Sequence, residues 1–174
     1  MSIVEALHEW HEFYVMVGGA AAVLLGLLFV AASLGEGLTS RKSQAMTRMF
    51  MSPIVIHFSS VLFICTIGVI PPHRPLFFSA IIGATGLAGT VVSIVISVRL
   101  FNIWQDHSDH LAYGLVPVVG YLLVFAAAIM MATKNELSLD VLAAGILTLL
   151  LVNIRNVWDL TLAMVRRRGR RRKN

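Results

Sequence analysis

The stretch that decides the fold is "LFFSAIIGATGLAGTVVSIVISV" (residues 76–98), which contains no charged side chain. A helix rises about 1.5 Å per residue, so this stretch is long enough to cross the roughly 30 Å hydrocarbon core of a bilayer. Four other apolar runs have similar length, which gives expected spans at 13–34, 50–70, 76–98, 112–132 and 139–161. We therefore predict an all-α fold, a polytopic membrane helical bundle with five transmembrane helices.

Composition supports a membrane protein of one domain. Of the 174 residues, 57% are hydrophobic and 13% are charged, whereas soluble domains average about 25% charged residues. We predict a single five-helix transmembrane domain over residues 1–165 and a basic cytoplasmic tail over 166–174. The lone Cys65 excludes an intramolecular disulfide. The N-terminal "MSIVEALHEWHE" is acidic and lacks the basic start of a signal peptide.

The positive charge is concentrated at the C-terminus, in "RRRGRRRKN" (residues 166–174). A basic block directly after a transmembrane helix fixes topology and contacts anionic lipid headgroups. We therefore expect the bilayer, and no nucleic acid, to be its partner.

The other lysines and arginines give the orientation. The loops 35–49 and 99–111 share a side with the tail, and this side holds Arg41, Lys42, Arg48, Arg99 and the seven basic residues of the tail, against Arg74 and Lys134 on the other side. The positive-inside rule then predicts the N-terminus outside and the C-terminus in the cytoplasm.

Small residues recur every fourth position in two of the expected helices. The first has Gly18, Ala22 and Gly26, and the third has Thr85, Gly89, Ser93 and Ser97. Such stripes let membrane helices approach closely. We predict helix packing for both, although the hydroxyls of the second stripe would also suit a hydrated path or a contact between subunits. Five short helices leave little room for a cavity within one protomer, which favours a homo-oligomer.

A set of polar residues is expected near the cytoplasmic ends of the helices. In "LLLVNIRNVWDLTLAMV" (residues 149–165), polar side chains follow one another at one-turn spacing, and the ionisable His57 lies at a comparable depth in the second span. This inner polar belt consists of His57, Arg99, Asn153, Arg155, Asn156 and Asp159. Arg155 and Asp159 are four residues apart and can pair. The belt either lines the mouth of a pore or binds a lipid headgroup; an interhelical clamp explains it equally well.

Two other clusters carry metal-ligand residue types. In "EALHEWHEFY" (residues 5–14), Glu5, His8 and Glu12 share a helix face, and "NIWQDHSDH" (residues 102–110) contains Asp106, His107, Asp109 and His110. The first is better explained as an interfacial helix with an aromatic anchor, and the second as a solvated loop. The topology puts them on opposite sides of the membrane. We expect no metal, no cofactor and no catalytic residues.

The run "WHEFYVMVGGAAAVLLGLLFVAASL" (residues 10–34) resembles the first helix of a family of small bacterial multi-pass membrane proteins, with the pattern W-x-x-F-[FY] followed by G-L-x-F-V-A-x-S-L. The matching residues are Trp10, Phe13, Tyr14, Gly18, Gly19, Ala22, Gly26, Leu27, Phe29, Val30, Ala31, Ser33 and Leu34. The resemblance covers one of the five expected helices and implies a bacterial inner-membrane location. Some members carry a label as modulators of a membrane-bound AAA protease. The resemblance implies no catalytic residues.

These observations predict a homo-oligomeric channel or pore for an ion or small solute, and not an enzyme. The alternative is a non-transporting accessory or regulatory subunit of another membrane protein. A histidine-ligated metal or haem protein is a third, less favoured, interpretation.

Overall fold

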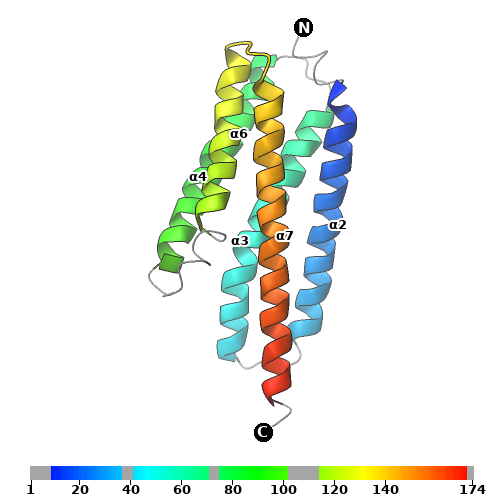
Figure 1. The fold of residues 1–174 in the computed structure, drawn as a ribbon, viewed down its shortest axis with the longest axis vertical. Helices are drawn as coiled ribbons and strands as arrows, with labels where there is room; N and C mark the ends of the chain where they lie inside the picture. Colours follow the sequence, from blue (N-terminus) through cyan, green and yellow to red (C-terminus); the bar gives the residue numbers. More distant parts are fainter. Residues whose placement is uncertain (1–8, 37–40, 71–74, 102–113, 172–174) are drawn as a thin grey trace.

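The computed structural model describes residues 9–36, 41–70, 75–101 and 114–171. These residues form five α-helices and no strand (Figure 1), with bounds α2 (His11–Glu36), α3 (Arg41–Val69), α4 (Pro75–Phe101), α6 (Val116–Ala132) and α7 (Ser138–Arg171). Each expected span corresponds to one helix, so the predicted all-α fold is confirmed.

Four of the helices contain apolar stretches long enough to cross a membrane. These stretches are His11–Ser33 in α2, Ser52–Val69 in α3, Leu76–Val98 in α4 and Ser138–Asp159 in α7. The chain is therefore a multi-pass membrane protein. Helix α6 is equally apolar but shorter, with 17 residues.

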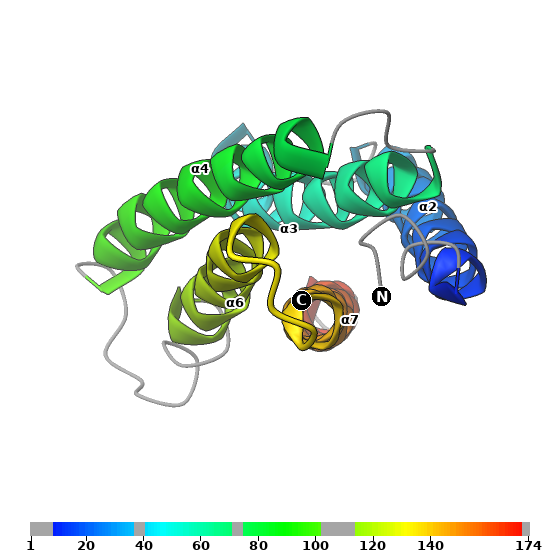
Figure 2. The same ribbon diagram turned by 90° about the horizontal axis from the view of Figure 1, so that it is seen from above.

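Consecutive helices run in opposite directions, so the start of α2 and the end of α7 lie at opposite ends of the bundle (Figure 1). Seen from above, α4, α3 and α2 form a curved row, and α6 and α7 lie on one side of it (Figure 2). Helix α2 packs on α3, while α6 packs on both α4 and α7. The bundle therefore has two parts, the pair α2–α3 and the group α4–α6–α7, which meet where α3 contacts α7 and α4.

The core follows a regular helical period. Buried residues on α7 are separated by alternating steps of three and four: Leu139, Leu142, Ile146, Leu149, Asn153 and Asn156. This average of 3.5 residues is the spacing of helices that pack side by side with a left-handed twist. The last two residues of this series are polar, so the buried face of α7 changes from apolar to polar side chains at Asn153 and remains in the core.

Three helix ends differ from the expected spans. Helix α3 begins at Arg41 and contains Pro53, so the segment before the second span is continuous with it. Residues 114 and 115 form a π-helical turn before α6. Helix α7 continues to Arg171, so the backbone has no break at the predicted start of the basic tail.

A tight turn joins α6 to α7. The amide of Lys134 donates to the Met131 carbonyl at 3.1 Å, and the amide of Asn135 donates to the Met130 carbonyl at 2.9 Å. This pair of bonds is the Schellman pattern, which requires a left-handed residue after the helix. Lys134, with φ 57°, occupies that position.

Candidate functional site: a buried polar junction

His57 of α3 lies in the interior of the bundle, with 2% of its surface exposed. Its Nδ1 is 3.0 Å from the hydroxyl oxygen of Tyr121 on α6, and Tyr121 is itself fully buried. The two rings are 5.5 Å apart between centroids and tilted by 49°. This hydrogen bond joins the α2–α3 pair to the α4–α6–α7 group. Ser60, one turn on from His57, donates from its hydroxyl to the Ile56 carbonyl at 2.9 Å.

Glycines position the Tyr121 ring. A Cβ atom built on Gly89 of α4 would lie 2.6 Å from Cγ of Tyr121, so no larger residue fits beneath the ring. On the other side of α6, a Cβ atom on Gly120 would lie 2.8 Å from Cδ2 of Leu149 on α7. Tyr121 is therefore held between α4 and α3 at the level where α6 and α7 are in close contact.

Asn153 adds a second polar group from α7. It is completely buried, and its Nδ2 donates to the Leu149 carbonyl at 2.7 Å. Its Oδ1 and the Nε2 of His57 have no hydrogen-bond partner among the described residues. Asn156, nearly one turn further along α7, is 2% exposed. We call His57, Tyr121 and Asn153 the polar junction.

The charged members of the inner polar belt lie elsewhere on α7. The side chains of Arg155 and Asp159 are 58% and 40% exposed, and Arg155 Nε is 3.9 Å from Asp159 Oδ2. The predicted pairing is confirmed, but it joins two turns of one helix and does not clamp two helices together. The reason is the helical rotation: Arg155 follows Asn153 by two positions, which turns its side chain by about 200° around a helix of 3.6 residues per turn. The side chain of Arg99 lies outside the described residues.

The two small-residue stripes have different environments. Gly18 packs on α3, where an added Cβ atom would lie 3.0 Å from Cβ of Cys65. Ala22 and Gly26 are exposed, and a Cβ atom on Gly26 would have no described atom within 4 Å. A helix has 3.6 residues per turn, so residues four apart are rotated by about 40° relative to one another. The later members of this stripe therefore point away from the face that packs on α3. The face of α2 that packs on α3 instead contains the buried residues Tyr14, Val17 and Ala21.

The stripe on α4 faces α6 for much of its length. Besides Gly89, the stripe has Ser93 buried at 2% exposure, and Ser97 donates from its hydroxyl to the Ser93 carbonyl at 2.7 Å. A Cβ atom on Gly114 would lie 2.9 Å from Oγ of Ser97. Thr85 is half-buried and donates to the carbonyl of Ile81 at 2.9 Å. Helix α6 thus covers hydroxyls that would otherwise suit a hydrated wall.

The two clusters of metal-ligand residue types are only partly described. Glu5, His8 and residues 102–110 lie outside the described residues, while His11 and Glu12 are exposed. Among the residues that the structure describes, no group of three His, Cys, Asp or Glu side chains could hold a metal ion. The predicted aromatic cluster is present: Trp10 and Phe13 contact edge to face with centroids 5.4 Å apart.

Sequence reasoning missed Tyr121, although a signal for it existed. In "VPVVGYLLVFAAAIMMA" (residues 116–132), its hydroxyl is the only polar side-chain group. A buried tyrosine hydroxyl usually finds a partner. Pairing it with His57, the only ionisable residue in the apolar stretch of α3 apart from Cys65, was therefore a reasonable expectation.

Comparisons of the chain with protein-family models, curated proteins and solved structures found no match.

Proposed function

We propose that the protein crosses the bacterial inner membrane five times, with its N-terminus outside and its basic tail in the cytoplasm. Helix α6 runs antiparallel to its neighbours α4 and α7, and its 17 residues extend over about 25 Å at 1.5 Å per residue. It must return the chain to the side where α7 begins. The distribution of lysine and arginine supports the orientation, and the resemblance of the first helix supports the location.

Cysteine labelling tests this topology. In a Cys65→Ser background, Glu136→Cys, in the exposed turn between α6 and α7, should react with a membrane-impermeant maleimide added to spheroplasts. Lys173→Cys should react only after the membrane is permeabilised. The opposite pattern would reverse the orientation, and labelling of both from outside would show that α7 does not cross the membrane.

We further propose that the protein is a homo-oligomeric channel or pore for an ion or small solute, with a path through the polar junction. The observation that supports this is a fully buried set of polar groups, contributed by three helices, in the middle of an apolar bundle. Ionisable residues inside membrane bundles commonly mark ion or substrate pathways because they are costly to bury. Each unpartnered buried polar atom costs about 1–3 kcal/mol, and the junction has two that lack a partner among the described residues. A purely structural contact would be expected to satisfy them.

This path differs from the one that the sequence suggested. The hydroxyl stripe on α4 is covered by α6, so it is a poor candidate for a wall between subunits. The exposed faces of the described helices carry large apolar side chains such as Val23, Leu87 and Leu151, which suit lipid or another protein. The polar groups that remain for a path lie inside the protomer.

Flux through reconstituted vesicles tests the proposal. Purified protein in liposomes should release an entrapped ion or small solute, and His57→Phe and Asn153→Leu should each reduce the rate of release about tenfold. Thr148→Val is the matched control, because Thr148 lies on the same helix and donates only to the carbonyl of Ala144 at 2.7 Å. No release by the unaltered protein across a panel of ions and solutes, or full release by both variants, would overturn the proposal.

A second candidate function is favoured by the outer face of α2. Gly19 and Gly26 have no described atom within 4 Å of an added Cβ, so the other described helices leave this part of the α2 surface uncovered. Such a surface suits close packing with a helix of another membrane protein. For an accessory subunit, Gly26→Leu should abolish co-purification of a partner while the thermal stability of the isolated chain is unchanged. A partner retained by the variant would count against this surface.

A further inference from the structure

The polar junction leaves two buried polar atoms open to a ligand, Nε2 of His57 and Oδ1 of Asn153. Asn153 uses Nδ2 to bond the Leu149 carbonyl at 2.7 Å, which leaves Oδ1 as its open group. Nδ1 of His57 lies 3.0 Å from the Tyr121 hydroxyl oxygen, and either group can donate the proton of this bond, depending on the His57 tautomer. A neutral imidazole that accepts at Nδ1 has its proton on Nε2. In that tautomer the open atoms are an N–H of His57 and a carbonyl oxygen of Asn153.

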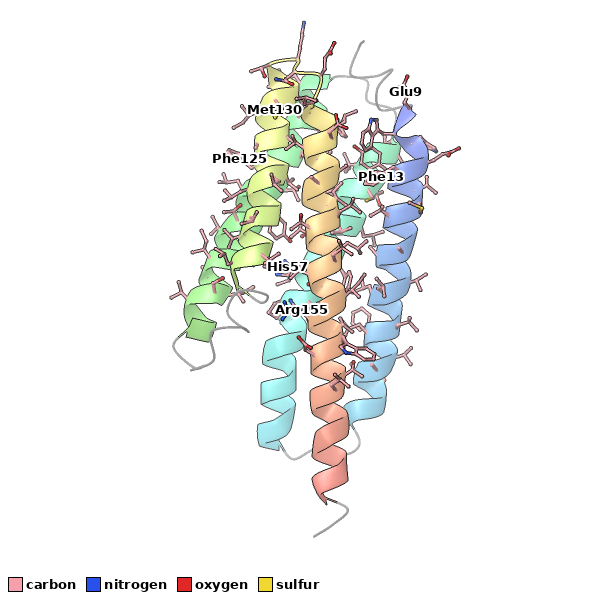
Figure 3. The ribbon with its side chains drawn as sticks, in the orientation of Figure 1. Glu9, Phe13, His57, Phe125, Met130 and Arg155 are labelled. Atoms are coloured by element: carbon pink, nitrogen blue, oxygen red, sulfur yellow. The ribbon has the colours of Figure 1, made fainter. Side chains whose placement is uncertain are left out.

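The register of the helices puts these two atoms at one level. Leu149 contacts Gly120, and α7 runs antiparallel to α6, so Asn153 lies one turn from Leu149 toward the start of α6. Side chains on a helix lean toward its N-terminus, which brings the Tyr121 hydroxyl to the same level. Figure 3 shows His57 beside α7 and slightly above Arg155. Asn153 precedes Arg155 by two positions on α7, which corresponds to about 3 Å along the helix axis.

We infer that His57 holds its proton on Nε2 and that the junction binds a neutral hydroxylic molecule, water or a small alcohol, between Nε2–H of His57 and Oδ1 of Asn153. This inference rests on the proposed function and names its substrate class. A hydroxyl group both accepts and donates a hydrogen bond, so it satisfies both open atoms at once. Buried waters typically bind where two to four polar groups converge in this way.

Charged ligands fit the same atoms poorly. A bare cation would face the N–H dipole of His57 and find only one carbonyl oxygen, whereas monovalent and divalent cations take several oxygen ligands. An anion would face Oδ1 of Asn153. The carboxylate nearest along α7, Asp159, is partly exposed and pairs with Arg155. The junction therefore selects an uncharged ligand that can both accept and donate a hydrogen bond.

Nitrogen-15 NMR of histidine-labelled protein in nanodiscs tests the site itself. His57, assigned by its loss in His57→Gln, should be the Nε2–H tautomer, and that proton should show a cross-peak to water. Asn153→Leu should remove the cross-peak, with Asn153→Ala as a second variant if the first does not fold. Thr148→Val should keep it. A proton on Nδ1, or a cross-peak unchanged in both Asn153 variants, would overturn the inference.

Permeation measurements separate this inference from the proposed function. Stopped-flow light scattering of proteoliposomes should show water or glycerol permeability that falls about tenfold in Asn153→Leu, the effect of losing one hydrogen bond to the ligand. Potassium and chloride conductance should be absent. Ion conductance without hydroxylic permeability would overturn the inference and leave the channel proposal in place. If neither ions nor hydroxylic solutes move while the NMR cross-peak is present, the channel proposal fails and the binding site stands.

Discussion

The approach of α4 to α6 gives a sharp prediction about stability. A Cβ atom at Gly86 would lie 2.7 Å from the backbone nitrogen of Phe125 and 2.9 Å from its Cα. Backbone atoms cannot rotate away, so Gly86→Ala forces the two helices apart by several tenths of an ångström or more. Overpacking of this kind costs about 1–3 kcal/mol. We expect the free energy of unfolding to fall by that amount, relative to a matched substitution on an open face.

Gly26→Ala is the matched substitution. It makes the same chemical change in the middle of a helix and gains the same helix propensity, about 1 kcal/mol, but an added Cβ has nothing within 4 Å. The difference between the two variants therefore isolates the contact between α4 and α6. The assay is reversible unfolding in mixed micelles with increasing SDS, followed by circular dichroism. If Gly86→Ala unfolds at the same SDS fraction as Gly26→Ala, α4 and α6 do not approach each other as closely as the structure shows.

Three further predictions use the same protein. Lys134→Gly should raise the free energy of unfolding by about 1 kcal/mol, because glycine adopts the left-handed conformation without the clash of Cβ; a lower midpoint in the SDS titration would contradict the turn geometry. Arg155→Gln should change stability by less than about 1 kcal/mol because its ion pair is exposed, whereas Tyr121→Phe should lower it by about 1–2 kcal/mol through loss of a buried hydrogen bond; the reverse ranking would refute this assignment. Cys65, 1% exposed and packed against Gly18, should react with a fluorescent maleimide only after SDS unfolding, and rapid reaction of the folded protein would show that α2 does not cover it.

The sequence by itself determined that this is an α-helical membrane protein and where its helices lie. The physical reason is local: in lipid each backbone polar group must be satisfied within its own segment, so a long apolar run such as residues 76–98 has one stable form. Apolar length and breakers between the runs were enough to place each helix. The pairing of Arg155 with Asp159 was equally local, because residues four apart on a helix are neighbours.

Only the tertiary structure decided which polar residues share a site. The inner polar belt was a group defined by depth, and depth does not specify the direction in which a side chain points. Asn153 and Arg155 are at nearly one level, yet one is fully buried and the other is 58% exposed, because they project from different sides of α7. Tyr121 meets His57 although 64 residues separate them in sequence. That contact depends on how α6 packs against α4 and α7 over glycines at positions 86, 89 and 120, and packing between helices is a property of the whole bundle.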